Sequence, residues 1–149
     1  MFTLDIAALE AQQMGGGLSV TFPFSSATGT ADTAAVYMVF EPGGALPEHT
    51  DSAEEWLLVL EGTVEATVGD ETGILEGGQL ALVPAIAPHS ARNIGDGPAR
   101  ILGFFGASTN VAHFSDELAP GVKTLVVGAE PGIALPVPAL EPTVAVAVA

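Results

Sequence analysis

The chain has 149 residues, 48% of them hydrophobic, so it can bury one core, and we expect a single domain. Its formal net charge is −15 with only three basic residues, which argues against binding to nucleic acids or to anionic membranes. It has no cysteine, which excludes disulfides, cysteine-bound zinc, iron–sulfur clusters and thiol catalysis.

The beginning of the chain predicts a short helix over residues 3–14, because three glycines follow it at Gly15 to Gly17. This segment has neither the basic start nor the long apolar run of a signal peptide, and we expect a cytoplasmic protein. Residues 18–24 predict the first strand.

Apolar segments separated by turn signals follow, which is typical of an all-β fold. Further strands are predicted at residues 34–41, 54–61, 63–69, 74–76, 79–83 and 98–107. Residues 69–73 predict a hairpin turn. In the strand before that turn, Val64 and Ala66 alternate with Thr63 and Glu65, which indicates one buried and one exposed face.

The strand predicted at residues 54–61 is apolar on both faces, with Leu57 and Val59 on one and Trp56 and Leu60 on the other. Something must therefore cover its outer face, either the N-terminal helix or a second subunit. We expect a homodimer.

The pattern of apolar segments separated by turn signals weakens after residue 107. Residues 129–149 are rich in proline, alanine and valine, which favours an extended tail. The most apolar part of this tail, residues 133–149, is interrupted by three prolines and a glutamate, so we do not expect it to span a membrane.

Two histidines and two carboxylates are the candidate functional residues. His49, Asp51 and Glu55 have the same parity and would share one face if their segment is extended. His89 comes from a later segment and would meet them across the fold. Imidazole and carboxylate ligands together suit Fe, Mn, Co, Ni or Zn. The third histidine, His113, lies outside both segments and is interpreted as a structural or surface residue.

Each of these residues alone has an ordinary interpretation. A single histidine or aspartate is most often a solvated surface residue. Glu55 differs because it opens the apolar strand Trp56 to Leu60, where a buried carboxylate needs a partner.

The spacing of these residues resembles the two motifs of the cupin superfamily. The first motif, Gly-x5-His-x-His-x3-4-Glu-x6-Gly, corresponds to Gly43, His49, Asp51, Glu55 and Gly62. The second, Gly-x5-Pro-x-Gly-x2-His-x3-Asn, corresponds to Gly78, Pro84, Ile86, His89 and Asn93. Eight of the ten fixed positions match, and Asp51 and Ile86 are the two departures.

The resemblance implies a jelly-roll β-barrel that closes two sheets over a central cavity. We expect its core at residues 34–107, with a helix-and-strand extension at residues 1–33 and a C-terminal extension and tail at residues 108–149. Ile86 replaces a turn glycine, which would shift the loop before His89. Asp51 replaces the second histidine of a set that is three histidines and one glutamate in similar cupins.

The resemblance also implies a divalent metal ion, Fe, Mn, Ni or Zn, bound by His49, Glu55 and His89, with Asp51 as a fourth ligand or as a general base. Asp51 and Glu55 are the candidate catalytic residues. Cupins similar to this one include dioxygenases, isomerases, epimerases and decarboxylases, and the fold does not choose among them.

We favour a dioxygenase acting on a small enol, phenol or keto compound. A cupin isomerase or decarboxylase and a non-catalytic module that binds a small molecule stay open as alternatives. We expect Tyr37 or Val39 and Phe104 or Phe105 to line the pocket.

Overall fold

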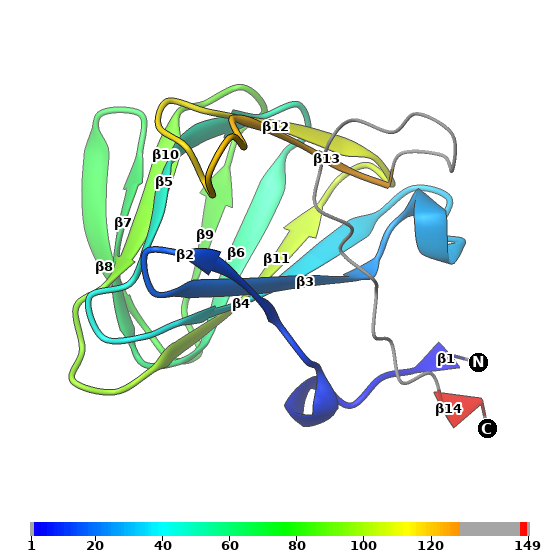
Figure 1. Ribbon diagram of the computed structural model, residues 1–149, viewed down its shortest axis with the longest axis horizontal. Coiled ribbons are helices and arrows are strands. Elements are labelled where there is room, and N and C mark those ends of the chain that lie inside the picture. The colour runs from blue at the N-terminus through cyan, green and yellow to red at the C-terminus, as the bar shows by residue number, and fades with distance from the viewer. Residues whose placement is uncertain (1, 129–146, 149) are drawn as a thin grey trace.

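The computed structural model describes residues 2–128 and 147–148, and these residues form an almost entirely β structure (Figure 1). Two six-stranded antiparallel sheets face each other and enclose the core. This arrangement confirms the predicted all-β jelly-roll barrel.

Many neighbouring strands in the two sheets come from distant parts of the chain. In order across the sheet, one sheet consists of β13 (Thr124–Val127), β12 (Asn110–Phe114), β5 (Ala45–Asp51), β10 (His89–Asn93), β7 (Thr63–Val68) and β8 (Glu71–Glu76). The other consists of β2 (Gln12–Gly15), β3 (Leu18–Phe24), β4 (Ala34–Phe40), β11 (Ala99–Phe105), β6 (Glu55–Glu61) and β9 (Leu80–Val83). A separate short pairing joins β1 (Phe2–Thr3) to β14 (Ala147–Val148).

The N-terminal segment differs from the predicted helix at residues 3–14. Only Ile6–Ala8 is helical, as the 3-10 helix η1, and Asp5 caps it by accepting a hydrogen bond from the Ala7 N–H at 3.0 Å. Residues 12–15 form strand β2 instead. The reason is that Gly16 and Gly17 both adopt positive φ, at 58° and 74°, and make the tight turn that returns the chain as β3.

The apolar alternation located most strands well. Val64 and Ala66 of β7 are buried, as expected, and Glu65 is exposed. The hairpin from β7 to β8 is tighter than predicted, because Val68 pairs directly with Glu71. A second 3-10 helix, η2 (Ser26–Thr28), lies in the loop after β3.

The two sheets also take strands from outside residues 34–107, with β2 and β3 before this range and β12 and β13 after it. The predicted tail lies outside the described residues, apart from the two residues of β14. Within the described part of the chain, no helix is long and apolar enough to cross a membrane.

Part of the outer face of the second sheet, over β6, β9 and β11, is apolar and exposed. Trp56 on β6 is 52% exposed and is paired with Leu82 on β9 and Phe104 on β11, which are 50% and 44% exposed. Leu80, two residues before Leu82, is 53% exposed. These four residues form a surface that we name the outer patch. The helix η1 does not cover them, so the first of the two expected covers is wrong.

Candidate metal centre

The four candidate residues meet inside the barrel. His49 and Asp51 are alternate residues at the end of β5 and therefore point to the same, inner side. His89 opens β10, in direct register with His49. Glu55 opens β6 on the opposite sheet and faces His89. None of the four is more than 5% exposed.

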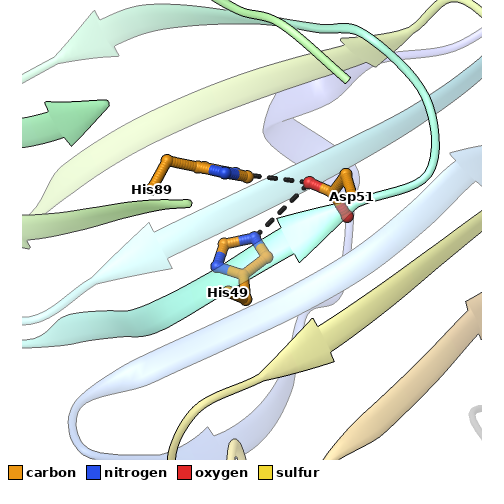
Figure 2. Close-up of side chains that lie close together, drawn as sticks. All are labelled: His49, Asp51 and His89. Carbon is orange, nitrogen blue, oxygen red and sulfur yellow. Dashed lines mark ion pairs between the residues drawn. The ribbon is translucent and has the colours of Figure 1, made fainter. Parts of the chain in front are cut away.

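Asp51 lies beside the two imidazoles and contacts both, as Figure 2 shows. Its Oδ2 atom is 3.5 Å from His49 Nε2 and 3.2 Å from His89 Nε2. Glu55 Oε2 is 3.4 Å from His89 Nε2. The two imidazole rings are 4.0 Å apart between centroids, so the donor atoms converge on one small volume.

The outer nitrogens of both rings are occupied by carbonyl groups of the backbone. His49 Nδ1 is 2.9 Å from the Pro47 oxygen, and His89 Nδ1 is 3.0 Å from the Ala87 oxygen. A carbonyl only accepts, so each Nδ1 carries the proton and each neutral ring presents the lone pair of Nε2 to the centre. This arrangement is common for histidines that bind a metal.

Two of the inner atoms lack hydrogen-bond partners among the described residues. Asp51 Oδ2 and His89 Nε2 are fully buried and make no hydrogen bond among the described residues. With His89 neutral, two lone pairs face each other across 3.2 Å, which is unfavourable unless a cation lies between them. The ligand atoms of His49, Asp51 and His89 all lie within 4.8 Å of one another. This His/Asp/His group can therefore bind a metal ion.

Without a metal, a proton is the alternative cation. Burial acts to lower the pKa of His89, but the adjacent carboxylates of Asp51 and Glu55 outweigh it and raise that pKa to about 10. Burial acts to raise the pKa of Asp51, yet the two histidines and Asn110 hold it well below its ordinary value. For Glu55 burial dominates, and its pKa is raised.

Asn110, at the start of β12, orients Asp51 and was not predicted from the sequence. It is completely buried, and its Nδ2 donates a hydrogen bond of 2.6 Å to Asp51 Oδ1. Its own Oδ1 accepts from the Ala53 N–H and the Ser52 hydroxyl, both at 3.1 Å. The amide is thereby fixed, and only Oδ2 of Asp51 faces the histidines.

Gly103 on β11 makes room for Glu55. A Cβ atom at this position would collide with Glu55 Oε1 and with the Val36 side chain. A glycine inside an apolar strand is the signal that could have revealed this close approach.

A small cavity of about 40 Å³ lies beside the cluster. Val36, Met38 and Phe105 line it, together with Phe114, which stacks on His49 at 4.7 Å between ring centroids. The prediction of Phe105 is confirmed. Tyr37 and Val39 were wrong, because the residues of β4 that face the cavity have even numbers, and Phe104 belongs to the outer patch.

The sequence of the barrel matches a known family. No curated protein matches the chain. Residues 36–105, which include both motifs, match the sequence model of the family described as Cupin domain. The barrel of this chain belongs to the cupin superfamily.

Solved structures agree with this cupin in fold. An oxalate oxidase with the substrate analogue glycolate has a TM-score of 0.68 and 20% identity, covering 76% of this chain and 63% of that one. A cupin sugar phosphate isomerase from Silicibacter pomeroyi has a TM-score of 0.61 and 20% identity, and the match covers 85% of this chain and 92% of that one. The cupin domain of Cnp3 from Schizosaccharomyces pombe has a TM-score of 0.61 and 20% identity, and the match covers 69% of this chain and 72% of that one. At such identities the likeness concerns the fold alone.

The second departure from the cupin motifs, Ile86, adopts a backbone conformation that favours glycine. Its φ is 66°, a left-handed value that is costly for a β-branched residue. Its N–H donates to the Asp51 carbonyl oxygen at 2.8 Å, which ties the loop before His89 to the site. The backbone of this loop is therefore strained at Ile86.

The remaining motif and histidine positions are structural. Asn93 is buried, and its Nδ2 lies 2.8–3.2 Å from the carbonyl oxygens of Phe40, Glu41 and Gly97. His113 is exposed on β12, and its Nδ1 is 3.1 Å from the Thr124 hydroxyl, away from the cluster. This placement confirms the interpretation of His113 as a surface residue.

Proposed function

We propose that this cupin binds a divalent metal ion through His49, Asp51, Glu55 and His89, and that it is a dioxygenase acting on a small enol, phenol or keto compound. The observation that carries the metal proposal is the convergence of Asp51 Oδ2 and His89 Nε2, which are buried and have no hydrogen-bond partner in the part of the chain that the structure describes. Burying four such groups costs folding stability, and a bound cation offsets that cost.

A bound ion would supply Lewis acidity and open coordination positions for oxygen and substrate. A dioxygenase fits a site without other redox groups, because both atoms of O2 enter the product and the substrate itself is the reductant. The chain has no cysteine that could supply electrons.

The chain's own residues would handle the proton and the water. We assign Glu55 as a base as well as a ligand: one of its carboxylate oxygens would hold the metal, and the other would take the hydroxyl proton of an enol or phenol. Asn110 would hold Asp51 with one oxygen turned inward. The apolar wall of Val36, Met38 and Phe105 would exclude bulk water from the reacting groups.

The structural relatives include both an oxidase and an isomerase, so an isomerase or decarboxylase is the alternative activity. Uptake of O2 distinguishes these reactions. The Fe(II)-loaded protein should consume O2 with at least one enol or phenol, and label from 18O2 should appear in the product at two atoms per turnover.

Glu55→Gln provides the test of the assigned base. We expect it to lower kcat per bound metal ion at least tenfold, with the metal content of both proteins measured because Glu55 is also a proposed ligand. If the metal-loaded protein consumes no O2 with any enolic or phenolic compound, the dioxygenase proposal is wrong. Ligand binding without turnover would favour the non-catalytic binding module.

A further inference from the structure

We infer that the cavity beside the metal centre selects small, uncharged ligands and rejects carboxylate anions such as oxalate. This inference rests on the proposed function, because it assumes a divalent ion at the four-residue cluster. It goes further by naming the class of substrate.

The first reason is the charge of the ligand set. Carboxylates that bind a metal are deprotonated, so Asp51 and Glu55 together cancel both positive charges of a divalent ion. A cupin with three histidines and one glutamate keeps one net positive charge at the same place. An anion entering this cavity would therefore meet a neutral centre, and its approach would gain no net electrostatic attraction.

The second reason is the lack of any cation in the wall. The polar residues that line the cavity are His49, Asp51, Glu55 and Asn110, and all other lining residues are apolar. An anion loses its hydration there and finds no cationic side chain in the wall to replace it, which is costly in an apolar site.

All three basic residues of the chain lie away from the cavity wall. Arg100 donates to the Tyr37 hydroxyl at 2.7 Å and to Glu61 at 2.9 Å. Arg92 and Lys123 are exposed, and Lys123 donates to the Ser115 carbonyl at 3.3 Å. Since the sequence has no other lysine or arginine, nothing else in the chain could pair with an anionic group in the cavity.

The third reason is size. A volume of about 40 Å³ leaves room for roughly three water-sized groups. The cavity thus fits a small compound or the reactive end of a larger one. A sugar phosphate, whose charged group needs cationic partners, fits neither the volume nor the wall.

A matched pair of ligands tests the inference. Catechol and 3,4-dihydroxybenzoate share the same two oxygen donors, and only the second carries a distant carboxylate. Calorimetry on the Zn(II)-loaded protein avoids turnover and measures binding directly. We expect catechol to bind at least tenfold more tightly than 3,4-dihydroxybenzoate, and oxalate to show no binding at the concentrations used for catechol.

Asp51→Asn provides a charge variant with nearly the same shape. It removes one negative charge from the cluster and should shift the ratio of the two dissociation constants at least threefold towards the anion. Glu48→Gln is the matched control, because Glu48 is exposed on the opposite face of β5 and changes the net charge of the chain equally. We expect no shift in that variant.

The outcomes separate the two proposals. If the parent protein binds no zinc, the proposed metal centre itself fails. If it binds zinc and then binds 3,4-dihydroxybenzoate or oxalate as tightly as catechol, the inference about substrate charge is overturned. Failure of all three ligands to bind the zinc-loaded protein overturns it as well. The comparison of the three ligands on the zinc-loaded parent protein tests the inference even if Asp51→Asn does not bind zinc.

Discussion

Asn110 donates a hydrogen bond of 2.6 Å to Asp51, and this contact decides which oxygen of Asp51 faces the two histidines. Because Asn110 Oδ1 is occupied by Ser52 and Ala53, the amide cannot turn over without losing both bonds. The residue that departs from the cupin motif is thus supported by a partner from a strand outside both motifs.

Replacing Asn110 should weaken metal binding beyond its effect on stability. Asn110→Ala leaves Asp51 free to rotate, and we expect a loss of tenfold or more in metal affinity, as is typical for residues that orient ligands. Asn93→Ala is the control, since Asn93 is equally buried but bonds only to the backbone outside the site. Both variants should lose about 1–3 kcal/mol of stability, and equal metal affinity in the two would contradict this role.

The metal-free protein should lose stability as the pH rises through the neutral range. The pKa of His89 is raised from 6.5 to about 10, so its charged form stabilises the fold fully below pH 6.5 and ceases to do so above pH 10. The raised pKa of Glu55 acts in the same direction, starting above its ordinary value of 4.5.

Asp51 acts in the opposite direction. Its pKa is below the ordinary 3.8, so its contribution is present above pH 3.8 and disappears as the pH falls further. Urea unfolding in the presence of a chelator, measured from pH 3 to pH 10, should therefore show greatest stability in the mildly acidic range. The loss of stability above pH 6.5 should be smaller in His89→Gln than in the parent. An equal loss in both proteins would mean that groups other than His89 cause it.

Ile86→Gly should stabilise the protein. A β-branched residue at a φ of 66° costs about 1–2 kcal/mol, and glycine removes that cost while losing about 0.5–1 kcal/mol through backbone entropy. We expect a net gain of about 1 kcal/mol by denaturant unfolding. Ile74→Gly is the control, because Ile74 is similarly exposed, at 61% against 64%, but lies in strand β8 with negative φ, and its replacement should destabilise.

The outer patch predicts association of two copies of the chain. Trp56, Leu80, Leu82 and Phe104 form a continuous apolar surface without a charge among them, whereas the chain as a whole carries −15. The negative charges of two copies repel each other, so the copies can approach most easily through the uncharged outer patch. In a dimer with a two-fold axis, the outer patch of each copy contacts the outer patch of the other.

Trp56→Glu should abolish this association. Sedimentation of the parent should give twice the monomer mass at micromolar concentration, and the variant should give the monomer mass. Ile74→Glu places the same charge on the other sheet and should leave the dimer intact. A parent that sediments as a monomer at all concentrations would contradict the expectation.

Alternation and motif spacing are local properties, so the sequence predicted strands β3, β4, β6, β7, β8, β9 and β11 and singled out the four candidate residues. His49 and Asp51 share a face of β5 through their parity, whereas Glu55 meets them from β6 of the opposite sheet. Glu55 at the head of an apolar strand already required a partner. The unusual residue at Asp51 was visible in the sequence, but the oxygen that it turns towards the histidines was not, since that depends on the contact with Asn110.

The errors also have physical causes. Strand β4 is apolar on both faces. Alternation therefore places Val36 and Met38 on one face and Tyr37 and Val39 on the other, but it does not indicate which pair faces the cavity. Strand β12 reads Asn-Val-Ala-His-Phe, which is too short and mixed to stand out, so Asn110 was missed. The predicted N-terminal helix was too long because Gly16 and Gly17 form a hairpin turn between two strands rather than the end of a helix.

The most direct test of the central claim is the metal content of the protein after incubation with Fe(II), Mn(II), Ni(II) or Zn(II) and removal of free metal. The parent and His113→Ala should each retain close to one ion per chain, and His89→Ala should retain little. Absence of bound metal from the parent, or equal retention in His89→Ala, would contradict a metal centre built from His49, Asp51, Glu55 and His89.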